Sequence, residues 1–373
     1  MTVTRRVEIA APFFTEEDRA RIHAGVEEIL SGALSMGPNV KAFEQEFARR
    51  SGVGHAVAMN ACTSALEISL AALGLAPGDE VIVPPLTFIA TGMAVHLAGG
   101  RPVFAELSED TLCLDFEDVK RRVTPRTRGV ILVYFAGLMP SGLEEFARDC
   151  RERGLFLIED AAHAPGARRR GRAAGSWGDT GCFSFYPTKI ITAGEGGMLT
   201  TNDDALAAVA RSLQHRGRDL TAAQEQYALA GRNVRMTELT ALVGRVQLDR
   251  LDEYLAARRA VVAHYADALA GDTAGRLILA DEPEASSYWK LPLLLEPGRD
   301  REIVAARLRE AGVQSDAGYS PAMHLQPVMR RLYGTREGLL PRSEALLARL
   351  LCLPCHPLVA PEDVERAVEA LTA

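Results

Sequence analysis

The chain has 373 residues, of which 47% are apolar and 24% are charged, and its net charge is −7. These proportions exclude a largely disordered or fibrous protein, and the negative charge gives no electrostatic reason to expect a nucleic acid as a partner. The sequence contains no apolar run of about 18 residues, and residues 1–10 lack the apolar core of a signal peptide. We therefore expect a cytoplasmic protein with no membrane partner.

Helix-like and strand-like segments alternate along the first two thirds of the sequence. Helical patterns occupy 42–50, 63–73 and 142–153, and apolar strand-like segments occupy 55–59, 80–83, 129–134, 155–158, 181–185 and 197–200. Short apolar strands without clean alternation, separated by helices, predict a mainly parallel sheet that helices cover on both faces. An α/β domain of this kind places its sites at the carboxyl ends of the strands.

The pattern changes after residue 236. A helical run almost free of Gly and Pro extends to about residue 270, and Gly244 is expected to soften or kink it. A strand at 288–295 and helices at 301–311 and 361–371 follow. We predict a large α/β domain over 1–250 and a smaller α+β domain over 251–373. The basic run at 168–172 is predicted to be a solvated turn and not a site for a polyanion.

Lysine is scarce in this chain. The 42 basic residues include only four lysines, at positions 41, 120, 189 and 290. Lys189 ends the segment FSFYPTK, next to a predicted strand, and three glycines follow within residues 194–197. Aromatic and apolar neighbours desolvate a lysine, which lowers its pKa and makes the neutral amine a nucleophile. A solvated surface lysine is the alternative, but the other three lysines have ordinary settings, so Lys189 is the predicted reactive lysine.

Two carboxylates follow the buried strand at 155–158. Asp160 at such a strand end suits pairing with a cationic ring nitrogen, as pyridoxal phosphate enzymes require. Two alternatives stay open at this stage. Asp160 and His163 could be two ligands of a metal site, although no third ligand stands at a recognisable spacing. The carboxylate could also cap a helix.

The segment 60–66 predicts a strand that passes into a helix whose first turn carries Thr63 and Ser64. Free backbone N–H groups and the helix dipole make this geometry suitable for a phosphate, and ordinary capping by either hydroxyl is the alternative. Near the other end, Cys352, Cys355 and His356 match the C-x-x-C-H signature of attached haem. Haem attachment needs an exported chain, so we predict a strand of the small domain here, and no metal site.

Together and in this order, these motifs resemble the DegT/DnrJ/EryC1/StrS family of sugar aminotransferases, a branch of the fold-type I pyridoxal 5′-phosphate (PLP) enzymes. The resemblance extends from about residue 12 to the C-terminus. Its segments are TSAL at 63–66, PGDEVIVPP at 77–85, EDAA at 159–162, GSWGD at 175–179, FSFYPTK at 183–189, GEGGM at 194–198, RMTE at 235–238 and MHLQP at 323–327.

The resemblance implies a role for each matching position. Lys189 would hold the cofactor as a Schiff base and shuttle the proton, and Asp160 would keep the pyridine nitrogen protonated. Phe88 would stack on the cofactor ring. The phosphate would be bound by Thr63, Ser64 and Ser184, and by Asn233 from the partner subunit of a homodimer with shared active sites. His324 would lie in a loop near the substrate.

Two departures from the family pattern concern the substrate more than the reaction. His163 stands where the family commonly has Gln beside the cofactor's 3-oxygen, and its protonation would make activity more sensitive to pH. The usual Tyr-Asn-Tyr-Arg segment is Arg-Asn-Val-Arg at 232–235, so Asn233 lacks an aromatic neighbour on each side.

The implied reaction is a ping-pong amino transfer with PLP as cofactor and pyridoxamine 5′-phosphate (PMP) as its intermediate form. L-Glutamate would be the donor, and a nucleotide-linked 4-keto- or 3-keto-6-deoxysugar would be the acceptor. A cyclitol ketone, as in aminoglycoside assembly, is the alternative acceptor. A non-catalytic regulator on the same fold would be expected to lose Lys189 or Asp160, and both residues are present.

Overall fold

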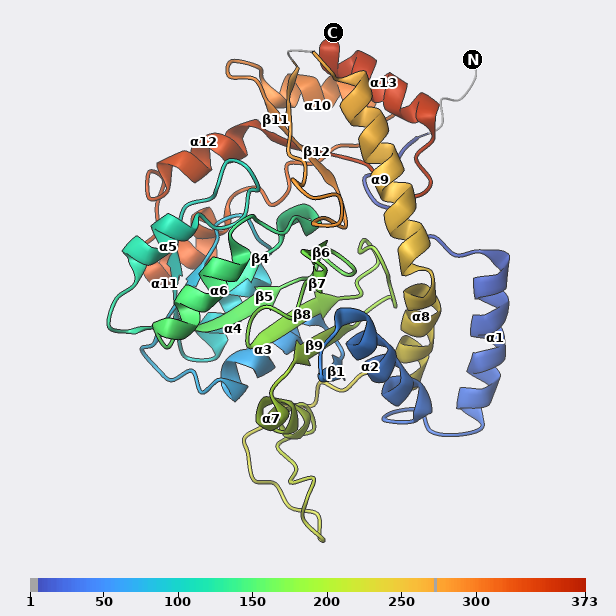
Figure 1. The fold of residues 1–373 in the computed structure, drawn as a ribbon, viewed down its shortest axis with the longest axis vertical. Coiled ribbons are helices and arrows are strands. Elements are labelled where there is room, and N and C mark those ends of the chain that lie inside the picture. Colours follow the sequence, from blue (N-terminus) through green and yellow to red (C-terminus); the bar gives the residue numbers. More distant parts are fainter. Residues whose placement is uncertain (1–5, 272–273) are drawn as a thin grey trace.

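The computed structural model describes residues 6–271 and 274–373. Residues 1–5 of the N-terminal segment, which is not expected to be a signal peptide, lie outside the described residues. A seven-stranded sheet forms the centre, in the order β1-β9-β8-β5-β4-β2-β3 (Figure 1). The strands from β3 to β8 in this order pair in parallel, whereas β9 is antiparallel to both of its neighbours. The strand bounds are β1 His55–Met59, β2 Glu80–Val83, β3 Arg101–Phe104, β4 Thr127–Val133, β5 Phe156–Asp160, β8 Thr180–Ser184 and β9 Gly197–Thr201.

Helices cover both faces of this sheet, as the sequence predicts. Alternate residues of one strand face two different cores: Val130 and Leu132 of β4 lie in the first, and Ile131 lies in the second. The first core is closed by α2 (Pro38–Ser51), α5 (Phe116–Arg122) and α6 (Leu143–Glu152). The second is closed by α3 (Cys62–Ala72), α4 (Ile89–Leu97) and α7 (Asp204–Gln214). The α/β class predicted from the alternation of elements is confirmed.

A smaller antiparallel sheet lies beyond the first and has its own core. It consists of β10 Gly275–Leu277, β11 Leu291–Leu295 and β12 Leu350–Leu353, with α10 (Arg301–Glu310) and α13 (Pro361–Thr372) beside it near the C-terminus (Figure 1). The other elements of this region are α11 Pro327–Tyr333, α12 Pro341–Arg349 and the 3₁₀ turn η2 Met323–Leu325. A domain boundary at residue 250 stays a prediction. The helix α9 (Leu251–Ala268) contributes side chains to the first core of the large sheet and also to the core of the small sheet.

The predicted long helix is two helices. α8 (Glu238–Asp249) ends at Asp249, Arg250 is its C-cap, and α9 begins at Leu251. The N-terminal segment accounts for the break, because the Gln247 side chain donates to the Phe13 carbonyl and Arg250 reaches Thr15 just before α1 (Glu16–Leu30). The expected kink at Gly244 is therefore wrong. A side chain at Gly244 would place its Cβ 2.7 Å from the Phe43 ring, so this glycine lets α8 pack closely on α2.

The basic run at 168–172 is only partly a solvated turn. It forms a short hairpin of β6 (Arg168–Arg169) and β7 (Arg172–Ala173). Arg169 is only 5% exposed, donates to the Met139 carbonyl and pairs with Asp281 and Glu282. The prediction overlooked these carboxylates because they lie more than 100 residues away in the sequence.

The C-x-x-C-H segment forms the predicted strand of the small sheet. Cys352 belongs to β12, and Cys355 is buried and donates to the Tyr288 carbonyl. β3, which begins with Arg101 and a proline, was not predicted from the sequence.

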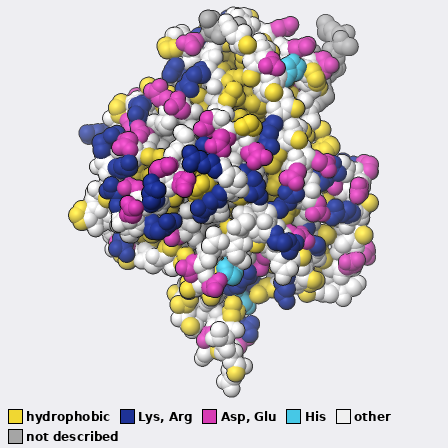
Figure 2. Space-filling model, in the orientation of Figure 1, with side chains coloured by type: hydrophobic (Ala, Val, Ile, Leu, Met, Phe, Trp, Pro, Cys, Tyr) yellow, Lys and Arg dark blue, Asp and Glu magenta, His cyan; other side chains and the backbone are white. Residues whose placement is uncertain are grey.

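None of the helices among the described residues is long and apolar enough to span a bilayer. On the face shown in Figure 2, acidic side chains are interspersed with basic ones.

Candidate active site

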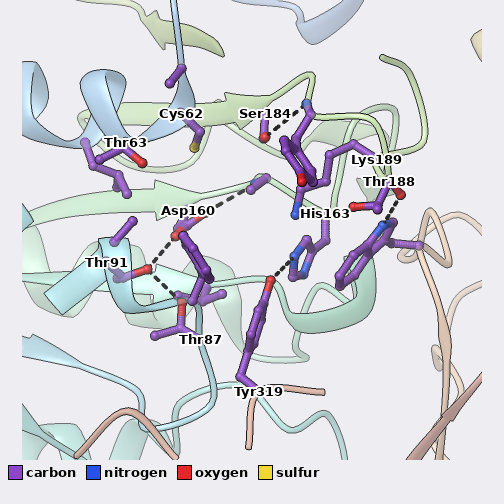
Figure 3. A pocket seen from close by; sticks show the side chains of 18 of the residues that line it. Cys62, Thr63, Thr87, Thr91, Asp160, His163, Ser184, Thr188, Lys189 and Tyr319 are labelled. Carbon is purple, nitrogen blue, oxygen red and sulfur yellow. Dashed lines mark hydrogen bonds between the residues drawn. The ribbon is translucent and has the colours of Figure 1, made fainter. Parts of the chain in front are cut away.

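A cavity of about 460 Å³ opens at the carboxyl ends of β5 and β8. Asp160 ends β5, Ser184 ends β8, and Lys189 follows β8 after a short turn (Figure 3). The N-terminus of α3 and the loop between β2 and α4 form further walls. Sites at the carboxyl ends of parallel strands are the expectation for an α/β sheet, and this cavity meets it.

Asp160 lines the cavity, and two hydroxyl groups in a row hold its carboxylate. Thr91 Oγ1 donates to Asp160 Oδ2 over 2.8 Å, and Thr87 Oγ1 lies 2.7 Å from Thr91 Oγ1 (Figure 3). Burial raises the pKa of the Asp160 carboxyl, while the Thr91 hydroxyl, the Ala162 N–H and the charge of Lys189 oppose that rise. Such a carboxylate gains from a cationic partner inside the cavity.

The neighbouring Glu159 has a structural role. Its side chain is fully buried and accepts from Tyr134 Oη and from the backbone N–H groups of Gly175, Trp177 and Gly178. Adjacent residues of a strand point to opposite faces, so only Asp160 reaches the cavity. The described elements include no helix that starts at Asp160, so the capping alternative is wrong.

Lys189 carries an amine suited to nucleophilic chemistry. Its Nζ forms no hydrogen bond or ion pair with any residue that the structure describes, and it lies 4.3 Å from the centroid of the Trp289 ring. Burial lowers the pKa of this amine to about 8, with repulsion from Lys290 acting in the same direction and Cys62 and Asp160 acting against it. A substantial fraction of the amine is therefore neutral near pH 8.

The start of α3 offers uncapped backbone donors. Ala61 is the N-cap residue and no side chain accepts from the first turn, so capping by Thr63 or Ser64 is wrong. Gly197 of β9 packs against this turn: a Cβ there would lie 2.3 Å from the Ala61 carbonyl carbon. The close approach of these two backbones explains why residue 197 is a glycine. The N-terminus of α3, where Thr63 lies, is open to the cavity.

His163 lies in a stack of rings. It packs on Trp289 with ring centroids 3.8 Å apart, and its Nε2 is 3.0 Å from the hydroxyl of Tyr319 (Figure 3). Burial lowers its pKa well below the usual value, and repulsion from Lys189 and Lys290 adds to the effect. His163 is therefore neutral across the physiological range, so the greater pH sensitivity expected from its protonation has no support in this geometry.

Six of the nine predicted site residues line the cavity: Thr63, Phe88, Asp160, His163, Ser184 and Lys189. The remaining three do not line it. The Ser64 hydroxyl donates to the Asn60 side chain. Asn233 is exposed in the segment before α8. The fully buried His324 contacts Glu344, so its position does not support binding to a substrate in this cavity.

The lining residues that were not predicted from the sequence include Thr91, Trp289, Lys290 and Tyr319. Thr91 could have been inferred from its closeness to the predicted Phe88, because it lies in the first turn of the helix that Phe88 precedes. Trp289, Lys290 and Tyr319 come from the region of the small sheet, and nothing in the sequence places them against β5. The interpretation of Lys290 as an ordinary strand lysine is wrong.

The fold and this cavity define a class of protein. A buried lysine of lowered pKa and a buried carboxylate share one cavity of an α/β sheet, next to a helix N-terminus that can take an anion. The described residues hold no group of three His, Cys, Asp or Glu side chains arranged for a metal ion. The arrangement suits an enzyme in which a lysine acts as a nucleophile.

Comparisons with known proteins identify the family. Residues 16–372 match the DegT/DnrJ/EryC1/StrS aminotransferase family. The chain is 36% identical to the GDP-perosamine synthase of Caulobacter vibrioides, over 98% of this chain and 97% of the relative. It is 35% identical to the dTDP-3-amino-3,4,6-trideoxy-alpha-D-glucose transaminase of Micromonospora megalomicea, over 95% of each chain.

A solved structure agrees in fold along the whole chain. The PLP form of a putative sugar aminotransferase from Streptococcus pneumoniae superposes with a TM-score of 0.90 at 25% identity, over 98% of both chains, and a PMP form is also known. The chain belongs to the DegT/DnrJ/EryC1/StrS aminotransferase family, and the predicted resemblance is confirmed.

Proposed function

We propose that this protein is a PLP-dependent aminotransferase that moves an amino group from L-glutamate to the keto group of a nucleotide-linked deoxysugar. The proposal rests on one observation. The amine of Lys189, which has a lowered pKa and no hydrogen-bond or ion-pair partner among the described residues, lies in the same cavity as the buried carboxylate of Asp160. The relatives support the acceptor class, because one is named as a GDP-perosamine synthase and another as a transaminase of a dTDP-linked amino sugar. These names favour a nucleotide sugar over a cyclitol ketone.

The cavity fits the phosphate of the cofactor at one end. The first turn of α3 has free backbone N–H groups, and the hydroxyls of Thr63 and Ser184 lie on the same cavity. A dianion at a helix N-terminus is stabilised by these donors and by the helix dipole. Ser64 would contribute through its backbone N–H, since its hydroxyl is bonded to Asn60.

The cavity also fits an aromatic ring. Phe88 is 56% exposed at the mouth of the cavity, so its ring is free to stack on a ligand. Asp160 can hold a pyridine nitrogen in its protonated form, and Thr91 keeps the carboxylate directed into the cavity. His163 can contact the ring substituent, although its Nε2 is shared with Tyr319.

When bound, the cofactor supplies an electron sink for the carbon that gains or loses the amino group. Lys189 would hold the cofactor through its amine, and its Nζ would carry the proton to and from the substrate carbon. Asp160 would stabilise the positive charge of the ring, and the side chains of Trp289, Phe88 and Tyr319 would limit the access of water. The two half-reactions use the same residues, so the donor and the acceptor bind in turn.

The proposal is tested on the purified protein with added PLP. We expect a yellow protein whose cofactor becomes fixed to Lys189 on borohydride reduction, located by peptide mass analysis. L-Glutamate is then supplied with a panel of nucleotide ketosugars and cyclitol ketones, and 2-oxoglutarate is measured. Attachment at another lysine, or no amino transfer to any acceptor, would contradict the proposal. Transfer to cyclitol ketones alone would replace the acceptor class.

The lowered pKa of Lys189 predicts the pH dependence of cofactor loading. Only the neutral amine attacks a carbonyl, so the rate at which Lys189 attaches to PLP should rise with pH and level off above about 8. An ordinary lysine would still gain rate up to about pH 10. The measurement is stopped-flow absorbance of the cofactor-free protein mixed with PLP from pH 6 to 10. A rate that still rises up to pH 10, or one that does not change over this range, would contradict the prediction.

A homodimer with a shared site is also part of the proposal. Asn233 is exposed and lies outside its own cavity, but the Asn60 N–H, just before α3, donates to the Val234 carbonyl. A bridge between Ser35 and Thr237 joins this segment to Leu34 and Met36, which are 58% and 44% exposed. Exposed apolar side chains of this size support a contact with a second copy that brings Asn233 to the partner's phosphate.

Complementation tests the shared site. Asn233→Asp sets a carboxylate against the phosphate and should expel the cofactor, and Lys189→Ala is inactive for a separate reason. In a mixed dimer, one site has both residues intact. With equal amounts and free exchange, half of the dimers are mixed, so activity should return to roughly a quarter of the parental value. If subunit exchange is demonstrated by native mass spectrometry and no activity returns, Asn233 acts within its own subunit.

A further inference from the structure

The basic residues of the cavity differ in type from those of the rest of the chain. Arginine accounts for 38 of the 42 basic residues of the chain, yet both basic side chains that line the cavity, Lys189 and Lys290, are lysines. The chemistry of Lys189 requires a primary amine, but that reason does not apply to Lys290. A lysine ammonium is a compact point charge with three donors, whereas a guanidinium is a flat fork. The lysine at 290 therefore presents a compact point charge to the cavity, where a guanidinium would present a flat fork.

The surroundings of Lys290 leave part of its ammonium free. Its side chain is 9% exposed, and Nζ pairs with Asp316 Oδ2 and lies 4.1 Å from the centroid of the Trp289 ring. The other oxygen of Asp316 accepts from the Gly318 N–H over 2.8 Å. Among the described residues, Asp316 provides the only hydrogen-bond acceptor for Lys290 Nζ. An ammonium with three donors can therefore bind a second anion on the cavity side.

We propose that Lys290 binds the α-carboxylate of the amino-acid donor and so places the donor's α-carbon beside Lys189. The inference rests on the proposed function. Both ammonium groups contact the same indole ring, with Lys189 Nζ 4.3 Å and Lys290 Nζ 4.1 Å from its centroid, so both charges act on the same part of the cavity. In an α-amino acid the carboxylate and the nitrogen share one carbon. A donor whose nitrogen replaces the Lys189 amine therefore carries its carboxylate towards Lys290.

The two half-reactions separate donor binding from acceptor binding. The PLP-loaded protein is mixed with L-glutamate alone, and the PMP-loaded protein with the acceptor alone, while the cofactor absorbance is followed. Lys290→Gln should weaken apparent glutamate binding by roughly ten- to a hundredfold, as expected for the loss of a charge-assisted contact, and leave acceptor binding within about twofold. An effect that acted through the pKa of Lys189, which Lys290 also lowers, would instead change both half-reactions.

Asp316→Asn is the matched control. It removes the partner of Lys290 and keeps the ammonium, so glutamate binding should stay the same or become tighter. If the ion pair only holds the loop that carries Tyr319, the two variants should weaken both half-reactions alike, and the inference fails. Unchanged glutamate binding in Lys290→Gln would overturn it, and so would a loss confined to the acceptor, which would assign the ammonium to an anion of the acceptor.

Two further measurements keep the test decisive if Lys290→Gln folds poorly. The double variant Lys290→Gln/Asp316→Asn removes both charges and should still bind glutamate weakly. Calorimetry with glutarate, an unreactive dicarboxylate, should show binding to Lys189→Ala and a loss of at least tenfold when Lys290→Gln and Asp316→Asn are added together. A parent that reacts with no amino acid would overturn the proposed function, and the inference with it. A reactive parent with unaffected variants overturns the inference alone.

Discussion

Lys189→Ala is expected to abolish amino transfer completely, while the protein stays folded. The methyl group of alanine can neither attack the cofactor nor carry a proton, and no other lysine among the described residues can replace it, because Lys290 is engaged by Asp316. The fold should tolerate the change, since the amine of Lys189 forms no hydrogen bond or ion pair with the described residues and its removal leaves no partner unsatisfied.

The measurement is steady-state production of 2-oxoglutarate, together with the absorbance of the bound cofactor and a thermal unfolding curve. Lys41→Ala is the matched control, because Lys41 is an exposed lysine on α2 and does not line the cavity. We expect the control to retain parental turnover. Turnover by Lys189→Ala at even a few per cent of the parental rate would refute its role as nucleophile and proton carrier.

Most of the sheet could be predicted because its strands are short and largely buried. The runs 81–83 and 129–133 contain no polar side chain, and burial on both faces leaves such a pattern almost no alternative to a central parallel strand. β3 was missed because it lies at the edge of the sheet and begins with the exposed Arg101, so its pattern has no long apolar run.

The errors in the fold come from contacts between distant segments. The break between α8 and α9 depends on residues 13–15 and the burial of Arg169 depends on Asp281 and Glu282. Helix propensity and charge patterning describe a segment and its immediate neighbours, so neither property contains these partners. Gly244 illustrates the same limit, because its role is set by the ring of Phe43 on another helix.

The site residues also divide into those that local sequence predicts and those that depend on contacts between distant segments. Asp160 and Lys189 could be predicted, because each follows a buried strand of the one sheet and strand ends converge at one edge. Lys290 and Tyr319 could not, since they reach the cavity from the region of the small sheet and their placement depends on how the two sheets pack. The motif that contains His324 was recognised, but its histidine lies buried against Glu344 and not in the cavity.

Asp160→Asn is expected to lower kcat by roughly 10²–10³-fold, as for the loss of a charge-assisted contact worth about 2–4 kcal/mol. An amide has nearly the shape of the carboxylate and can still accept from the Thr91 hydroxyl, so geometry and folding should persist. It carries no negative charge, and a protonated pyridine nitrogen beside it would be a buried cation without a counterion. The cofactor should bind and yet withdraw electrons poorly.

The control for this prediction is Thr91→Val, which removes the hydroxyl donor and leaves the carboxylate. It should cost much less than Asp160→Asn, roughly tenfold, because the charge stays and only its orientation is loosened. Both variants are compared by kcat and by cofactor content after dialysis. An Asp160→Asn enzyme within a few-fold of the parent would mean that the carboxylate only shapes the cavity wall. Burial raises the pKa of Asp160, and the Thr91 hydroxyl opposes this rise and so helps to keep the carboxylate ionised. Equal losses in the two variants would therefore mean that the contact with Thr91 matters as much as the charge of Asp160.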